Sequence, residues 1–319
     1  MLVNDSTHAF RVAILATLGH APDVIEPGRF HRFATRDRRG DSAGWCKLFD
    51  DMRAGVFGCH RQGVTQTWSA CELCAMTRAA RASLARQVAA VVRERERHQR
   101  DEWAINAERI ASLWAQCVPI TSSDPVHRYL CRRLVIDAFI APQCLRLHPA
   151  LDYWHGGDKL GAFPVMVAPI IAPDGRMVAL HRTYLTADGR KADVPAAKKL
   201  TRAAGPLAGA CIRMHTPMRG VIGVAEGIET ALAASQASGV PTVAAYCANA
   251  LAAYRLPAGV RRLVIFADND KAGREAAEVL QSRALRAGLQ SSVLTPTDAS
   301  ADWLDVWAAR GAVALECAA

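Results

Sequence analysis

The sequence predicts an α/β protein. A C-terminal domain with a doubly wound, mostly parallel sheet is preceded by an α+β subdomain and a small, mainly β N-terminal module. In the last hundred residues, short apolar runs alternate with helix-like segments that end in Gly, which is typical of buried parallel strands and their crossover helices. Earlier, two apolar runs flank Pro173-Asp174-Gly175, which predicts an antiparallel hairpin. Residues 30–68 are rich in Gly, aromatic residues and Arg, which favours a small antiparallel sheet.

The composition indicates a globular protein with excess positive charge. Its 319 residues, 51% hydrophobic, are enough for two or three domains. We expect no contact with membranes and a cytoplasmic location, because no run approaches the ~20 apolar residues of a membrane span and no signal peptide is evident. Ten cysteines in such a chain predict reduced thiols. The net charge of +9 predicts a polyanionic partner.

The positive charge is unevenly distributed. Residues 119–215 carry 13 Lys and Arg against 7 Asp and Glu, whereas residues 216–319 carry 9 against 10. This distribution suits a nucleic acid that is held by basic flanks while a metal binds the acidic part.

The first predicted domain, residues 1–75, is interpreted as a nucleic-acid-binding module. A helix over the first twenty residues precedes the small sheet. Aromatic side chains interleaved with Arg can form a stacking platform with phosphate anchors, or they can simply form the core of the sheet. The aromatic residues in question are Phe30, Phe33, Trp45, Phe57 and Trp68. The residues predicted here to bind nucleic acid are Arg32, Arg38, Trp45 and Arg61.

The same module contains a candidate zinc site formed by Cys59, His60, Cys71 and Cys74. The sequence has only one CxxC pair, however, where a zinc ribbon normally needs two. A Cys at the entry to a helix is often a small packed apolar residue instead. A degenerate Zn²⁺ site and packed thiols both remain open.

Two further domains are predicted before the C-terminal one. Residues 76–118 lack Pro and Gly and carry an apolar stripe, which predicts linker helices. Trp103, Ile110, Leu113 and Trp114 are expected to pack onto the next domain. Residues 119–215 are predicted to be a basic α+β subdomain, with a short helix at 126–130, strands at 144–147, 166–171 and 177–185, and a second turn at 187–189.

The C-terminal domain, residues 216–319, contains the candidate catalytic acids. Strands are predicted at 221–225, 242–245, 263–267 and 292–294, with helices at 228–238, 249–254, 272–287 and 302–309. Glu226 follows the first strand, and Asp268 and Asp270 follow the third. Acids at the carboxyl ends of parallel strands meet at one edge of the sheet, where open α/β folds bind ligands. Their mutual repulsion predicts a divalent metal, Mg²⁺ or Mn²⁺.

A Glu-Gly after one strand and a DxDxxG after a later one resemble the toprim domain of bacterial-type primases, topoisomerases and certain nucleases. The resemblance covers Arg219 to Gly311. It implies that Glu226, Asp268 and Asp270 are catalytic and bind metal, with Glu226 as a ligand or a general base. Asp302 and Asp305 occupy the place of a third acidic element of the family, and Lys271 is expected to neutralise a phosphate. Gly227 and Gly273 are expected to let the backbone approach metal or phosphate closely.

Residues 119–215 resemble the subdomain that precedes toprim in bacterial-type primases, where a basic ridge faces the acids. The resemblance implies that His181, Arg182, Lys198 and Lys199 contact template phosphate or the incoming triphosphate. A solvated basic hairpin is the alternative. The segment at 30–68 resembles the N-terminal module of plasmid- and phage-type toprim proteins. Bacterial-type primases also carry an N-terminal zinc ribbon.

These resemblances imply a DNA primase-like nucleotidyltransferase that makes short primers on single-stranded DNA from nucleoside triphosphates, in replication of a plasmid, phage or other mobile element. A separate replicative helicase is an expected partner, because the sequence has no Walker A motif. Two alternatives remain: a metal-dependent toprim nuclease, and a non-catalytic single-stranded nucleic-acid-binding replication accessory.

Overall fold

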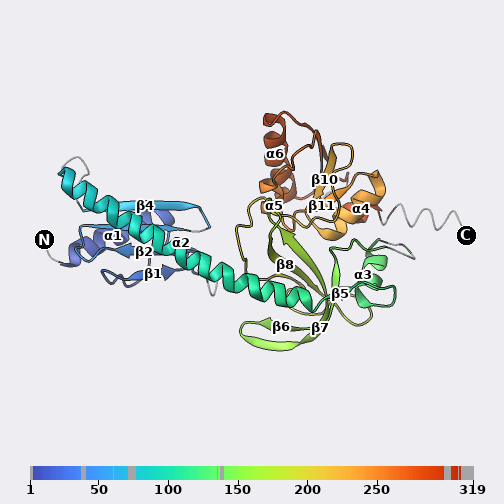
Figure 1. The fold of residues 1–319 in the computed structure, drawn as a ribbon, viewed down its shortest axis with the longest axis horizontal. Coiled ribbons are helices and arrows are strands. Elements are labelled where there is room, and N and C mark those ends of the chain that lie inside the picture. Colours follow the sequence, from blue (N-terminus) through green and yellow to red (C-terminus); the bar gives the residue numbers. More distant parts are fainter. Residues whose placement is uncertain are drawn as a thin grey trace, which may run out of the picture. The chain divides into compact units, whose positions relative to one another are not determined.

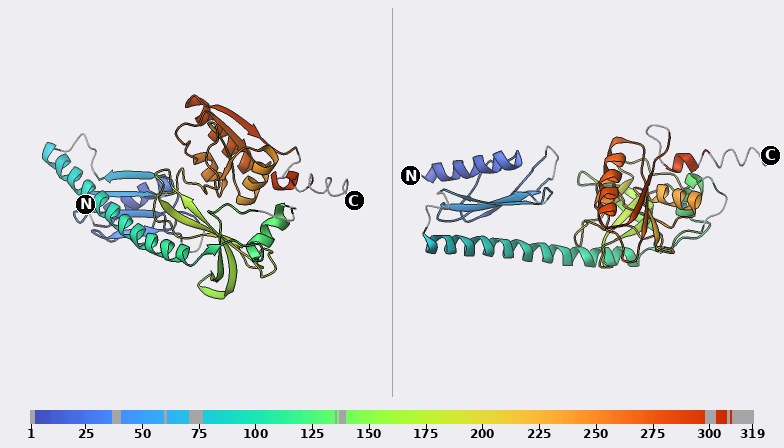
Figure 2. Two further views of the ribbon diagram at one scale, coloured as in Figure 1. Left: turned by 45° about the vertical axis from the view of Figure 1, so that its right-hand side comes forward. Right: turned by 90° about the horizontal axis from the view of Figure 1, so that it is seen from above.

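The structure is a computed structural model that describes residues 3–36, 41–59, 61–70, 77–134, 136, 140–297, 303–307 and 309. The chain forms two compact units, Met1–Asp101 and Glu102–Ala319 (Figures 1 and 2). The boundary falls inside the long helix α2 (Arg78–Ala115), which contributes residues to both units. In the described residues, no helix is both long and apolar enough to cross a bilayer.

The first unit is built on an antiparallel four-stranded sheet. Strands β1 (Phe30–Phe33), β2 (Gly44–Leu48), β3 (Ala54–Cys59) and β4 (Val64–Ser69) pair in sequence order and form the small antiparallel sheet that was expected. Helix α1 (Val3–Leu18) covers one face through Phe10 and Ile14, and the first turns of α2 cover the other through Leu84 and Val91 (Figure 2, right). All six residues of β3 are buried because both faces of the sheet are covered.

This two-sided cover corrects the expectation of an aromatic stacking platform. Trp45 is only 1% exposed, and Phe33 and Phe57 are also buried. Phe30 stacks on Trp45 with ring centroids 5.9 Å apart, and the Arg95 guanidinium lies over the same indole. Packed between the sheet and α2, Trp45 is a core residue with no face open to a base.

The second unit begins with an antiparallel five-stranded sheet. Its strands are β5 (Val118–Pro119), β6 (Arg146–His155), β7 (Asp158–Ile171), β8 (Met177–Tyr184) and β9 (Lys198–Leu200), which pair in sequence order. The predicted turn between β7 and β8 is present, with Gly175 at φ 91°. Strand β6 is much longer than the predicted strand 144–147 because it pairs with β7 as far as their connecting turn.

Helix α3 (Pro125–Leu134) begins where local chemistry predicts a helix start. The Asp124 carboxylate accepts hydrogen bonds from the backbone amides of Val126 and His127, both at 2.9 Å. Pro125 occupies the first helical position, where its missing N–H costs nothing. The helix buries Tyr129 and Leu130 against the rest of the unit.

The two faces of the antiparallel sheet pack against different partners. On one face, Leu180 and Tyr184 of β8 share a core with Ile110 near the end of α2, and Ile110 is 2% exposed. The predicted packing of Ile110, Leu113 and Trp114 is therefore confirmed. On the other face, the sheet shares a core with α3 and with the C-terminal sheet.

The C-terminal sheet is parallel throughout, as predicted. Its order is β11 (Thr242–Ala244), β10 (Val221–Ala225), β12 (Arg262–Phe266) and β13 (Gln290–Leu294). Helix α4 (Ile228–Ser238) packs on one face, while α5 (Ala248–Ala253) and α6 (Lys271–Arg286) pack on the other. Beyond this sheet, helical residues 303–307 bury Leu304 and place the Trp303 ring against Phe266.

Candidate active site

A cavity of about 210 Å³ lies in the second unit, at the carboxyl edge of the parallel sheet. Acids come from the ends of β10 and β12, and basic residues come from α3 and from the antiparallel sheet with its second turn. The lining residues are Arg133, His181, Lys191, Lys198, Glu226, Gly227, Ile228, Glu229, Thr230, Tyr246 and Asp268. Predicted acids and predicted basic residues therefore share one cavity.

Sheet topology explains why Glu226 and Asp268 meet. Strands β10 and β12 are neighbours, and Ala225 lies opposite Phe266 in the parallel register. Glu226 follows its strand directly, and Asp268 comes two residues after the other. Both carboxylates line the cavity.

The carboxyl group of Glu226 is in an unfavourable environment for its negative charge. Burial raises its pKa, and the nearby carboxylate of Asp270 raises it further. The ammonium group of Lys198 and the backbone amide of Ala248 offset only part of this effect. A cation bound beside Glu226 would stabilise its ionised form.

Asp270 takes a different position from Asp268. Its side chain caps α6, where Oδ1 accepts a 2.7 Å hydrogen bond from the backbone amide of Gly273. A Cβ at position 273 would lie 2.6 Å from the backbone oxygen of Asp268. Gly273 therefore lets α6 pack closely against the DxD loop, and its expected approach to metal or phosphate stays a prediction.

A buried charged cluster around Glu229 also adjoins this cavity. Glu229 is only 4% exposed; its Oε2 accepts a 2.9 Å hydrogen bond from Lys198 Nζ, and its Oε1 accepts a 2.5 Å hydrogen bond from the Tyr129 hydroxyl. Burial alone would raise the pKa of Glu229, but the Lys198 charge and the Tyr129 hydrogen bond outweigh it and lower the pKa to about 2. Glu229 is thus ionised at neutral pH and holds Lys198 at the cavity.

His181 lines the same cavity as a neutral imidazole. Burial lowers its pKa to about 4, and Glu229 only partly opposes this shift. Its Nδ1 is buried and has no hydrogen-bond partner among the described residues. At neutral pH this side chain can exchange a hydrogen bond with a bound molecule but contributes no charge.

Strand alternation divides the four residues predicted to form one basic ridge. Lys198 pairs with Thr183, two residues from His181, whereas Lys199 pairs with Arg182. Successive side chains on a strand point to opposite faces, so His181 and Lys198 reach the cavity while Arg182 and Lys199 do not. The Arg182 guanidinium lies near the Tyr184 ring, and Lys199 Nζ lies over the Tyr153 ring. The expectation that all four face the acids is corrected accordingly.

Several residues of the site were not expected from the sequence, among them Tyr129, Arg133 and Tyr246. Tyr129 looks like an ordinary core residue of an amphipathic helix, and Arg133 like an exposed one. Tyr246 has φ 67°, a left-handed conformation that costs a non-glycine residue roughly 1–3 kcal/mol. Its amide donates to the backbone oxygen of Glu226 at 2.8 Å, and its hydroxyl donates to Leu207. No local pattern marks such a residue in advance.

Of the remaining acidic and basic predictions in this unit, the two that the structure describes do not line the cavity. Lys271 is 86% exposed and pairs with Glu275 at 3.9 Å. Asp305 is exposed and does not line the cavity. Asp302 lies outside the described residues. The metal role of both aspartates remains a prediction.

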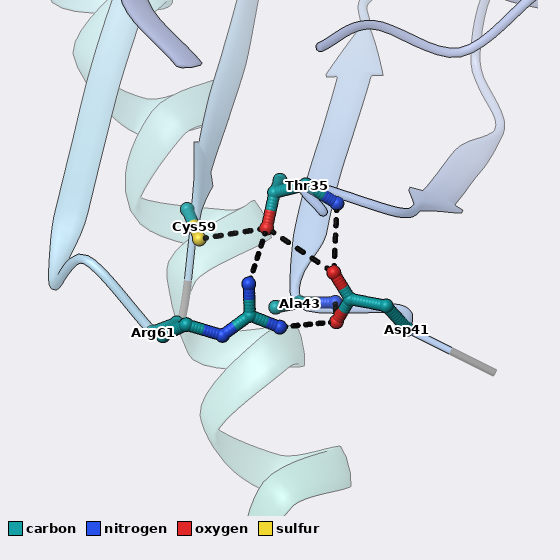
Figure 3. Close-up of polar contacts among 5 residues, drawn as sticks. All are labelled: Thr35, Asp41, Ala43, Cys59 and Arg61. Carbon is teal, nitrogen blue, oxygen red and sulfur yellow. Dashed lines mark hydrogen bonds and ion pairs between the residues drawn. The ribbon is translucent and has the colours of Figure 1, made fainter. Parts of the chain in front are cut away.

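In the first unit, the predicted binding residue Arg61 has an acidic partner. Figure 3 shows its guanidinium paired with Asp41 and donating to the Thr35 hydroxyl, which also contacts the thiol of Cys59. The ion pair reduces the capacity of Arg61 to hold a phosphate. Arg32 is exposed on β1, and Arg38 lies outside the described residues.

The predicted zinc site is largely beyond the described residues. His60, Cys71 and Cys74 lie outside them, so the Zn²⁺ prediction stays open. Cys59 is buried. Burial raises the pKa of its thiol, but Thr35, nearby backbone amides and Arg61 together outweigh this effect and lower the pKa.

The acidic edge of the cavity fits Mg²⁺ or Mn²⁺ better than it fits a fully protein-coordinated ion. Within the described ranges, no three His, Cys, Asp or Glu side chains are arranged to hold a metal by themselves. Mg²⁺ usually binds through one or two carboxylates, with water and substrate phosphate completing its shell. Glu226 and Asp268 provide such a pair. The raised pKa of Glu226 indicates that its negative charge is unfavourable there, and a bound cation would offset this cost.

Comparison with known protein families assigns most of the second unit. Residues 221–313 match the toprim domain, and residues 104–214 match a domain of unknown function, DUF7146. No curated protein matches the chain significantly.

Several solved primase structures are similar to this chain. A DNA primase domain from Pseudomonas aeruginosa is 19% identical over 53% of this chain and 55% of its own, with a TM-score of 0.34. The primase fragment of the bacteriophage T7 primase-helicase protein is 16% identical, and the match covers 58% of this chain and 68% of that fragment, with a TM-score of 0.36. The zinc-binding and RNA polymerase domains of the Aquifex aeolicus primase are 14% identical, and the match covers 98% of this chain and 84% of that chain, with a TM-score of 0.42. This chain thus spans little more than half the length of the first of these.

Proposed function

Because residues 221–313 are a toprim domain, we propose that this chain is a DNA primase-like nucleotidyltransferase that makes short primers on single-stranded DNA from nucleoside triphosphates. One observation carries the proposal: the toprim acids Glu226 and Asp268 share a cavity with the ammonium of Lys198 and the guanidinium of Arg133. Such a pairing suits nucleotidyl transfer, because the acids can bind the metal while the cations bind the triphosphate.

Glu226 and Asp268 would hold the divalent ion, with Asp270 close enough to add to their negative potential. When bound, such an ion stabilises charge on the transferring phosphoryl group and lowers the pKa of an attacking hydroxyl. Lys198 binds a phosphate oxygen while Glu229 and Tyr129 keep it in place. The elevated pKa of Glu226 also suits a general base, so either role is compatible with its environment.

The basic residues around the cavity give a nucleotide phosphate a defined place. Arg133 and Lys191 are exposed at its rim, whereas Lys198 reaches in with its side chain 40% exposed. The neutral imidazole of His181 exchanges a hydrogen bond with a base or sugar without adding charge. A role in plasmid, phage or other mobile-element replication, with a separate helicase, is the setting we propose for this chemistry.

A template-directed assay tests this function. Labelled nucleoside triphosphates, single-stranded DNA and Mg²⁺ are incubated with the full chain, with Asp268→Asn and with the matched control Asp158→Asn, whose carboxylate is exposed and outside the cavity. We expect the primer-synthesis activity of Asp268→Asn to fall by more than the roughly 10- to 100-fold typical of removing an outer-shell partner of a metal site, while the control keeps its activity.

Other outcomes would replace the proposal. Shortening of the template strand, without extension products, would identify a toprim nuclease. Retention of the strand with neither reaction, under both Mg²⁺ and Mn²⁺, would identify a non-catalytic binding protein.

A further inference from the structure

A second cavity of about 210 Å³ lies on the other face of the antiparallel sheet, next to the C-terminal half of α2. Arg182 of β8 lines it, together with Thr201 and Arg202, which directly follow β9. Arg109 and Asn106 of α2 close the other side, above the apolar side chains of Ile110 and Leu113. It is separate from the acidic cavity because Arg182 and His181 are successive residues on one strand and point to opposite faces.

The charges around this second cavity are all positive. Three arginines line it and no carboxylate does. Arg109 and Arg202 are exposed and form no hydrogen bond or ion pair with any described residue. Three cations gathered without a counter-charge repel one another, so an anion bound among them would lower the energy of the folded state.

Arg182 supplies an unused donor on the wall of the cavity. Its Nη2 donates to the backbone oxygen of Leu200 at 2.8 Å, and its Nη1 donates to the Tyr184 hydroxyl at 3.3 Å. Its Nε is buried and has no hydrogen-bond partner among the described residues. A buried donor without an acceptor is costly, and a bound oxyanion would satisfy it.

The walls of the cavity are already ordered. The Asn106 side-chain amide donates to the backbone oxygen of Ala203 at 2.9 Å, which joins α2 to the segment that carries Arg202. Thr201 Oγ1 accepts a 2.9 Å hydrogen bond from the backbone amide of Leu180, which leaves its hydroxyl proton available to a ligand. Ile110 anchors the helix in the core. Binding here would therefore require little ordering of the backbone.

We propose that Arg109, Arg182 and Arg202 form a second phosphate-binding site, distinct from the acidic cavity. Planar guanidinium groups bind phosphate oxygens through paired hydrogen bonds, and Thr201 can supply one more donor. The phosphate belongs either to the backbone of a nucleic-acid strand or to a free nucleotide. The inference does not rest on catalysis at Glu226 and Asp268.

Direct binding to the full chain tests the site with three probes: a fluorescein-labelled single-stranded oligodeoxynucleotide, ATP and inorganic phosphate. The double variant Arg109→Ala/Arg202→Ala is compared with wild type and with Arg286→Ala, an exposed arginine at the end of α6. For a strand-bound phosphate, we expect the double variant to bind about tenfold more weakly and its salt slope to fall by about 0.7, the value for one phosphate contact on a single strand.

The three probes separate the sources of the phosphate. Weaker binding of the oligonucleotide alone assigns the site to a strand backbone, and weaker binding of ATP or inorganic phosphate alone assigns it to a nucleotide; both support the site. Unchanged affinity for all three probes would overturn the inference, as would an equal loss in Arg286→Ala. Arg202→Lys keeps the positive charge but loses the paired donors of the guanidinium. Its affinity for the probe should lie between those of wild type and Arg202→Ala.

Folding and catalysis are controlled separately. The melting temperature of each variant reports its folding, and both truncated arginines are exposed, so we expect no decrease in it. Asp268→Asn should retain this phosphate site in full. A failed primer-synthesis assay together with weaker binding by the double variant would refute the catalytic proposal while supporting this inference.

Discussion

Replacing Glu229 by Gln tests the buried charged cluster. The substitution preserves shape but removes the carboxylate that faces Lys198 at 2.9 Å and Tyr129 at 2.5 Å. The pKa of Glu229 is about 2 against an ordinary value of 4.5, a difference of 2.5 units. At 1.36 kcal/mol per unit, ionised Glu229 contributes on the order of 3 kcal/mol at pH 7. Lys198 is 40% exposed and partly screened, so we expect a loss of about 2 kcal/mol.

The loss should depend on pH in a defined direction. The folded-state pKa of Glu229 lies below its unfolded-state pKa, so its contribution is complete above about pH 4.5 and is lost as pH falls towards 2. The difference in unfolding free energy between wild type and Glu229→Gln should therefore fall to less than half its neutral value at about pH 3.

Urea titrations of the full chain at pH 7 and pH 3 measure this difference. Unfolding in these titrations is followed by hydrogen exchange of peptides from α4, the helix that carries Glu229, because the two units need not unfold together. Glu275→Gln, which removes an exposed carboxylate 3.9 Å from Lys271, is the matched control and should change little. Equal destabilisation by Glu229→Gln at both pH values would show a packing defect and refute the electrostatic argument. In Lys198→Met the carboxylate loses its cation, and the pKa of Glu229 should rise.

Three further predictions concern other residues. Burial lowers the pKa of His181 to about 4 in the folded state, below its ordinary value of 6.5. As pH falls, this histidine is therefore protonated in the unfolded state before it is protonated in the folded state. About 3 kcal/mol of stability should be lost as pH falls from 6.5 to 4. His181→Asn should remove that slope from a plot of melting temperature against pH; an unchanged slope would contradict the assignment. Gly273→Ala should cost about 1–3 kcal/mol, measured by urea unfolding, because its Cβ would meet Asp268, whereas Gly227→Ala, with no atom closer than 3.4 Å, should cost little. Trp45→Ala should cost about 3–5 kcal/mol by the same measurement, while the salt slope of oligonucleotide binding stays at its wild-type value; a reduced slope would restore a binding role.

Local sequence patterns were sufficient to predict the acidic edge. Apolar runs that end in Glu226 and Asp268 predict parallel strands whose carboxyl ends meet, and β10 and β12 are neighbours in the sheet. The hairpin turn at 173–175 was predicted equally well because Gly and Pro act on the backbone locally. Each of these features depends on a few consecutive residues.

The distribution of the basic residues required the structure. Arg182 and Lys199 stand next to His181 and Lys198 in the sequence, yet the register of β8 and β9 sends each pair to a different face. The run of basic residues in the sequence predicts positive charge here, but it does not indicate to which face of the sheet each side chain points. Only pairing of the strands gives that direction, and it leaves a second basic cavity where one ridge was expected.

The sequence by itself determined the order of the elements and the residue types at the toprim edge, because strand periodicity and turn chemistry are local. Tertiary packing alone decided that Tyr129 bonds to Glu229, one hundred residues away, and that Trp45 is enclosed between the sheet and α2. Burial, and the pKa shifts that follow from it, depend on what covers a side chain from distant parts of the chain. That information is not contained in the residues beside it.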